Sequence, residues 1–151
     1  MIMQKELLYA LKKGRMAYEE KIVDAISEAV YQHKRYGINF SLALGASSAS
    51  SSEVKQFSQM LRESDQFIEL DEYFSCVLFT FVDIEQGIKA ASKMLSAFEM
   101  QFFSEEIYVS VLNAKECETI HEHITKLLNI LEHAITHGIK NIPLDGINLE
   151  H

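Results

Sequence analysis

Arg62 and Asp65 stand three residues apart and carry complementary charges. Together they could bind a nucleotide, since a guanidinium grips a phosphate or a guanine edge and a carboxylate accepts hydrogen bonds from guanine. The structural alternative is an arginine at a helix end and an aspartate that turns the chain into the next strand. Arg15 and Arg35 are the other arginines of the chain. A site that grips many phosphates is therefore not expected.

Asp71 and Glu72 form an acidic pair that offers oxygen ligands to a divalent cation. They also lie between two short apolar runs, where polar residues commonly form the turn of a hairpin. The second interpretation is favoured here. A residual metal-dependent enzyme acting through this pair is kept as a third hypothesis for the function of the chain.

The histidines near the C-terminus give a weaker signal. His133 and His137 lie one helical turn apart, a spacing that can bind a transition metal, but the sequence specifies no third ligand. His121 and His123 flank Glu122. All four histidines are predicted to lie on the surface, and no metal site, cofactor or catalytic triad is expected.

Residues 47–52 form a serine-rich tract between a predicted strand and a predicted helix. Backbone amides at such a helix start can hold an anion, but the lysine of a phosphate-binding loop is missing. A flexible, solvated connector is the preferred interpretation.

Composition limits the possible functions. The 151 residues carry 14 Lys and Arg against 22 Asp and Glu, a net charge of −8, which argues against a nucleic-acid binder. No apolar run approaches the roughly 20 residues that span a bilayer. Cys76 and Cys117 show no paired spacing, so a reduced, cytoplasmic setting is expected. Residues 149–151 resemble the start of an affinity tag.

Apolar periodicity predicts the elements that position these residues. Two N-terminal helices are expected, separated at Gly14. Then come a strand near 40–44, a short helix from 51, strands near 67–68 and 73–81, a helix over 84–102, a strand over 107–111, a long helix over 120–135 and an edge strand at 139–142. From the first strand on, the order is β-α-β-β-α-β, a ferredoxin-like α+β arrangement. It predicts an antiparallel sheet with helices mainly on one face, with N-terminal helices and a C-terminal helix added.

Several segments in this order resemble the diguanylate cyclase, or GGDEF, domain family. Arg62 to Asp65 resembles the family's Arg-x-x-Asp inhibitory motif, which precedes a signature hairpin. Further similar segments are 15–20, 77–80 with 83–85, 110–114, 131–134 and 138–142. Counted without gaps from Asp65, the five signature positions are Asp71, Glu72, Tyr73, Phe74 and Ser75. A gapped alternative starts at Glu69 and places Tyr73 at the position of the family's phenylalanine.

The departures from the family pattern bear on function. In either register both signature glycines are missing, and side chains there obstruct the close approach of a nucleotide. The family's metal-holding aspartate would fall near Gly45 and Ala46, which have no side-chain oxygen. The resemblance thus implies a degenerate bacterial signalling domain without cyclase activity, working through a protein partner or a homodimer. The alternative is a receptor for cyclic di-GMP through Arg62 and Asp65.

This interpretation divides the chain into three parts. Residues 1–35 are N-terminal helices, the second of which packs on the domain and could mediate dimer contacts. Residues 36–148 are the degenerate GGDEF-like domain, and 149–151 are the tag remnant.

Overall fold

A computed structural model of the protein describes residues 2–146 and contains one mixed sheet with helices around it. Its elements are α1 (Gln4–Tyr36), β1 (Phe40–Ser47), α2 (Ser51–Lys55), the 3-10 helix η1 (Gln56–Met60), β2 (Gln66–Glu69), β3 (Phe74–Thr80), α3 (Ile84–Gln101), β4 (Ile107–Asn113), the 3-10 helix η2 (Ala114–Glu116), α4 (Ile120–Thr136) and β5 (Pro143–Leu144).

The strand order is β2-β3-β1-β4-β5. The first four strands pair antiparallel, and β5 joins β4 in parallel. The predicted β-α-β-β-α-β arrangement and α+β class are therefore confirmed. In this register Gly45 of β1 lies between Ser75 of β3 and Val109 of β4, so β1 is the central strand.

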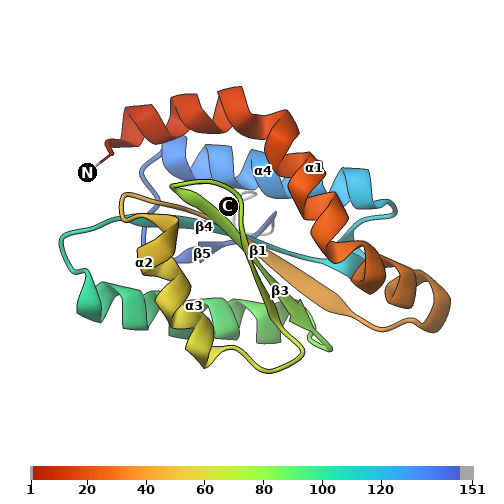
Figure 1. The fold of residues 1–151 in the computed structure, drawn as a ribbon. Helices are drawn as coiled ribbons and strands as arrows, with labels where there is room; N and C mark the ends of the chain where they lie inside the picture. The colour runs from red at the N-terminus through yellow and green to blue at the C-terminus, as the bar shows by residue number, and fades with distance from the viewer. Residues whose placement is uncertain (1, 147–151) are drawn as a thin grey trace.

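Helices cover both faces of the sheet. In Figure 1, α1 and α4 lie on one face, whereas α2 and α3 lie on the other. Alternate residues of β1 enter two different cores: Leu42 and Leu44 pack with the α1 and α4 side, and Ala43 packs with the α3 side. The prediction of helices mainly on one face is wrong, because the smaller residues of β1 also face a helix and are buried.

The N-terminal segment is one helix of 33 residues, so the break predicted at Gly14 is wrong. A glycine inside a helix costs only about 1 kcal/mol relative to alanine, and the burial of Leu7, Leu11 and Ile22 along the same face can offset that cost. Gly14 has a packing role instead, since a Cβ there would lie 2.6 Å from the ring of Tyr18. Both halves of α1 therefore belong to the core that α4 and the sheet share.

The last strand is displaced from its predicted place. It consists of Pro143 and Leu144, and the predicted strand at 139–142 is wrong. Asn141 adopts a left-handed conformation with φ 62°, and its backbone N–H donates to Ile107 O at 2.8 Å, which turns the chain before the strand. Proline is tolerated in β5 because β5 is an edge strand of the sheet.

Within residues 2–146, no helix is long and apolar enough to cross a membrane. The predicted tag remnant at 149–151 lies outside the described residues.

Candidate functional site

The turn between β2 and β3 carries the first three signature positions, Asp71, Glu72 and Tyr73, and the last two begin β3. The Asp71 carboxylate acts within the turn: its Oδ1 accepts from the backbone N–H groups of Tyr73 and Phe74, both at 3.0 Å. The backbone N–H groups of Leu70 and Asp71 in turn donate to Phe74 O. The predicted hairpin through Asp71 and Glu72 is confirmed.

Helix α1 clamps this turn from one side. The hydroxyl of Tyr18 donates to Asp71 Oδ2, and its ring stacks on Phe74 with ring centroids 4.8 Å apart. Lys21 Nζ donates to Leu70 O at 2.6 Å. Burial, followed by the hydrogen bond to Asp71, raises the pKa of Tyr18, so the hydroxyl stays a donor at neutral pH. No sequence signal links these α1 residues to the turn, and Tyr18 lies in the similar segment 15–20 without an assigned role.

The serine tract closes the turn from the other side. Ser47 N donates to Tyr73 O at 3.0 Å, and Ser51 N donates to Glu72 O at 2.5 Å. The Ser51 hydroxyl donates to Asp71 O at 2.5 Å. Ser47, Ser48 and Ser51 are buried. The prediction of a solvated connector is therefore wrong, because the hydroxyl and amide donors of the tract satisfy the carbonyls of the turn.

Few side-chain oxygens lie at this end of β1 and β3 to hold a magnesium ion. Gly45 and Ala46, where the resemblance would place a metal-holding aspartate, contribute no side-chain oxygen. Both carboxylate oxygens of Asp71 already accept hydrogen bonds. Among residues 2–146, no three His, Cys, Asp or Glu side chains are grouped so that they could hold a metal ion.

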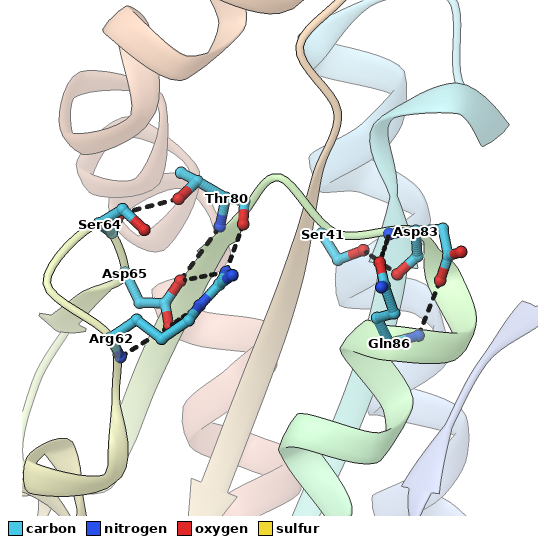
Figure 2. Close-up of polar contacts among 7 residues, drawn as sticks. All are labelled: Ser41, Arg62, Ser64, Asp65, Thr80, Asp83 and Gln86. Atoms are coloured by element: carbon cyan, nitrogen blue, oxygen red, sulfur yellow. Dashed lines mark hydrogen bonds and ion pairs between the residues drawn. The ribbon is translucent and has the colours of Figure 1, made fainter.

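Arg62 and Asp65 lie at the opposite end of β2 and bind each other. Arg62 Nη2 lies 2.8 Å from Asp65 Oδ1, and this hydrogen bond is the main cause that raises the pKa of Arg62. The Asp65 side chain is only 3% exposed and also accepts from the backbone N–H groups of Arg62 and Thr80. Figure 2 shows the guanidinium reaching on to Thr80 O and the Thr80 hydroxyl bonded to Ser64 O. These contacts agree with the structural alternative, in which Asp65 turns the chain into the next strand, and the ligand-binding interpretation stays a prediction.

A groove of about 370 Å³ opens beside this turn. Lys89 and Lys93 of α3 line it together with the exposed Phe81, whose φ of 60° is in the left-handed region. Neither lysine belongs to an ion pair with any residue in 2–146. With the Arg62 and Asp65 charges cancelling each other, the two lysines leave the groove cationic. Their four-residue spacing on a solvent-facing helix stripe was the available sequence signal.

Hydrogen bonds at the N-terminus of α3 hold the helix in place and thereby set the positions of Lys89 and Lys93. Asp83 and Gln86 form a reciprocal capping box, in which each side chain accepts from the backbone N–H of the other (Figure 2). The Ser41 hydroxyl of β1 donates to Asp83 O at 3.2 Å, which ties the helix start to the central strand. The close approach of Gly87 to Ser41 leaves no room for a Cβ, which would lie 2.9 Å from the serine.

The histidines take separate roles. His123 is 2% exposed, so its prediction as a surface residue is wrong; it stacks on Phe40, and its Nε2 lies 3.1 Å from Leu112 O. Burial lowers the pKa of His123 to about 4. His121 pairs with Glu19 of α1. The rings of His133 and His137 lie 4.2 Å apart, and no third metal ligand joins them within residues 2–146.

The chain matches known proteins in structure but not in sequence. No protein-family model and no curated protein matches the chain. Among solved structures, the GGDEF domain of YfiN (also named TpbB) from Pseudomonas aeruginosa superposes with a TM-score of 0.71 at 11% identity, covering 82% of this chain and 92% of that one.

Two further structures match over similar lengths. The GGDEF domain of DgcB from Caulobacter crescentus, in complex with cyclic di-GMP, gives a TM-score of 0.62 at 8% identity and covers 84% of this chain and 86% of its own. The active GGEEF domain of a diguanylate cyclase from Vibrio cholerae gives 0.63 at 14% identity, with 78% and 89% covered. The resemblance inferred from the motifs is confirmed at the level of the fold: the chain has the fold of GGDEF domains.

Proposed function

We propose that this chain is a GGDEF-fold signalling domain that lacks diguanylate cyclase activity and acts by contact with a protein, either a partner or a second copy. The observation that supports the proposal is the closed β2–β3 turn. Tyr18 and Ser51 occupy the polar groups of Asp71, and the amides of Ser47 and Ser51 occupy the next two carbonyls of the turn. A nucleotide could reach this turn only by displacing the chain's own donors.

Charge distribution supports the same proposal. Phosphoryl transfer with a metal depends on carboxylates that hold the cation against the phosphates. At this edge Asp71 is engaged in the turn, and Gly45 and Ala46 carry no ligand. The third hypothesis, a residual enzyme acting through Asp71 and Glu72, is disfavoured for the same reason.

Incubation of the purified chain with GTP and Mg²⁺, followed by chromatography of the products, tests the proposal. We expect no cyclic di-GMP above a protein-free control, under conditions in which an active GGDEF domain converts the substrate. Formation of cyclic di-GMP that stops when Asp71 and Glu72 are both replaced by Ala would overturn the proposal in favour of the residual enzyme.

A second candidate function, a receptor for cyclic di-GMP, is favoured by the groove beside Arg62. The Arg62 side chain is half exposed, and Lys89 and Lys93 line the groove without ion-pair partners among the described residues. The DgcB domain from Caulobacter crescentus was solved in complex with this ligand. For cyclic di-GMP to bind here, the Arg62 guanidinium would either bind a phosphate while it remains paired with Asp65, or leave Asp65 and pair with the phosphate instead.

Calorimetric titration with cyclic di-GMP discriminates the two candidates. A saturable heat in the wild type that is lost in Arg62→Ala, and weakened in Lys89→Ala and Lys93→Ala, would support the receptor. Lys12→Ala on α1 is the matched control, because it removes a lysine of the other face of the molecule. No heat at millimolar ligand leaves protein contact as the function.

A further inference from the structure

The central strand of the sheet carries small residues on the face that α3 covers. Ser41, Ala43 and Gly45 of β1 lie on this face, whereas Leu42 and Leu44 point into the core on the opposite face. A row of small residues leaves space beneath a helix unless the helix comes closer or larger neighbours fill the gap. The two ends of this row therefore have to be compared.

Helix α3 fills the space at one end of the row and not at the other. At Ser41 the helix is so close that a Cβ on Gly87 would lie 2.9 Å from the serine. A Cβ on Gly45 would come no closer than 3.8 Å to any atom beyond its chain neighbours. A cavity of about 50 Å³ lies at this second end. Its apolar lining comes from β1, α2, η1 and α3 and includes Ala43, Val54, Phe57, Leu95 and Phe98.

Ser75 of β3 supplies the one polar side chain among the residues that line the cavity. It lies beside Gly45 in the sheet and is only 8% exposed. Its hydroxyl has no hydrogen-bond partner within residues 2–146 and keeps contact with the cavity. A buried water typically makes about three hydrogen bonds, and this cavity offers a single side-chain partner. The cavity therefore favours a mainly apolar molecule over water.

We infer that this cavity binds a small neutral molecule that is mainly apolar and carries one hydroxyl or carbonyl group for Ser75. An apolar cavity of roughly 150 Å³ takes up benzene or xenon. This smaller cavity suits xenon or a molecule of a few non-hydrogen atoms, such as a short-chain alcohol. Phe57 and Phe98 border the cavity with ring centroids 6.0 Å apart. The partly buried Met94 also lines it, and its flexible side chain can adjust to the shape of a ligand.

A ligand in the cavity would contact two segments that adjoin the β2–β3 turn. Val54 belongs to α2, which lies on the same face of the sheet as α3 (Figure 1), and Ser51 at the start of α2 donates to Asp71 O. Ser75 directly follows Phe74, whose carbonyl accepts from the backbone N–H of Asp71. Binding should therefore tighten the packing of α2 and of the turn on the sheet. This site is separate from the proposed function, because it needs neither a nucleotide nor a protein partner.

Proton–nitrogen correlation NMR of the whole chain tests the inference with two probes, 1-propanol and xenon under pressure. We expect both probes to cause saturable shifts centred on the amides of residues that line the cavity, such as Gly45, Ser75 and Val109. Shifts that do not saturate, or that spread over the exposed surface and spare these residues, would overturn the inference.

Ser75→Ala tests the hydrogen bond. It should weaken the binding of 1-propanol about fivefold and leave xenon binding unchanged, because only the alcohol has a hydroxyl group. Ser96→Ala replaces an exposed serine of α3 and should change neither affinity. An unchanged propanol affinity in Ser75→Ala would overturn the role of Ser75.

Gly45→Ala fills part of the cavity without straining the fold, since the added methyl group meets only ordinary contacts. Both probes should then bind at least fivefold more weakly. The melting temperature should rise, because the methyl group fills empty space and restricts the unfolded chain. Unchanged affinity for both probes in Gly45→Ala would place their binding elsewhere and would overturn the inference. Formation of cyclic di-GMP would reject the proposed function alone, and absence of probe binding would reject the cavity site alone.

Discussion

At each end of β2, an aspartate accepts hydrogen bonds from the backbone of a turn, but the two aspartates differ in burial and in their side-chain partner. At one end Asp65 accepts from the backbone N–H groups of Arg62 and Thr80, and at the other Asp71 accepts from those of Tyr73 and Phe74. Asp65 is almost fully buried and has a charged partner on its own turn. Asp71 is exposed, and its partner is the neutral hydroxyl of Tyr18, which comes from a distant helix.

The difference shows what each turn can still do. The Arg62–Asp65 turn is completed by Thr80 of the adjacent strand β3 and by no residue of a distant helix. The groove beside it stays open and is lined by Lys89 and Lys93, which form no ion pair within residues 2–146. The β2–β3 turn is completed by α1 and the serine tract, whose donors occupy the Asp71 carboxylate and the carbonyl groups of Asp71, Glu72 and Tyr73. Hydrogen bonds within a turn can thus account for a residue pair, such as Arg62 and Asp65, that a motif would assign to ligand binding. Whether a ligand binds then depends on the neighbouring surface, here the groove lined by Lys89 and Lys93.

Asp65→Ala should produce the largest effect. It leaves the backbone N–H groups of Arg62 and Thr80, and the Arg62 guanidinium, without the acceptor that the buried Asp65 side chain provides. We expect the free energy of unfolding to fall by about 2–3 kcal/mol, measured by urea denaturation. Glu63→Ala in the same turn is the control and should change it little. A loss below 1 kcal/mol would mean that Asp65 does not stabilise this turn, and the two ends of β2 would then not be two turns that each depend on an aspartate.

His123 provides a contrast, as a buried group that must stay uncharged. Its pKa of about 4 in the folded state lies below the value of about 6.5 expected for the unfolded chain. The unfolded state therefore binds the proton first, and folding stability falls as the pH drops from 6.5 towards 4, by up to about 1.4 kcal/mol per pH unit.

Urea denaturation at pH 7.5 and pH 5 checks this sign. The wild type should lose more stability between the two pH values than His123→Gln, which cannot take up the proton. His137→Gln serves as the control on the same helix and should keep the wild-type dependence. Equal losses in the wild type and His123→Gln would show that His123 is not the group that titrates.

Asp71→Ala should have the next largest effect. It removes the acceptor of two turn amides and of Tyr18, but solvent can replace part of what is lost because Asp71 is exposed. We expect a decrease of about 1–2 kcal/mol in the free energy of unfolding. Amide hydrogen exchange at Tyr73 and Phe74 should accelerate, while exchange within the Arg62–Asp65 turn stays unchanged. Faster exchange in both turns would show that the two ends of β2 are not independent.

Much of the fold was predictable because its signals are local. Alternating apolar residues marked the strands, and three- and four-residue apolar steps marked α3 and α4, whose structures begin within a residue or two of the predicted places. The errors occurred where tertiary packing overrode a local rule. Helix α1 continues through Gly14 because the burial of Leu7, Leu11 and Ile22 can offset the cost of a helical glycine, and the serine tract is buried because it meets the β2–β3 turn.

The site was predictable only in part for the same reason. The sequence placed Asp71 and Glu72 in a turn and Arg62 beside Asp65, since these relations span a few residues. It could not show that Tyr18 meets Asp71 across 53 positions, or that His123 is enclosed, because those contacts exist only once the sheet has paired. Lys89 and Lys93 show only a four-residue spacing, which does not by itself mark a site, and their position beside Arg62 exists only in the folded chain.

Tyr18→Phe should produce the smallest effect and isolates the link between α1 and the β2–β3 turn. The ring remains on Phe74, and only the hydroxyl that donates to Asp71 is removed. We expect a loss of about 0.5–1.5 kcal/mol, against no change in Tyr31→Phe, an exposed tyrosine of the same helix. A double-mutant cycle with Asp71→Ala should return most of the Tyr18→Phe loss as coupling energy, because the second change has no acceptor left to break. Additive losses would mean that ring packing alone joins α1 to the turn. The two aspartates at the ends of β2 would then differ in exposure, but neither would depend on a distant helix.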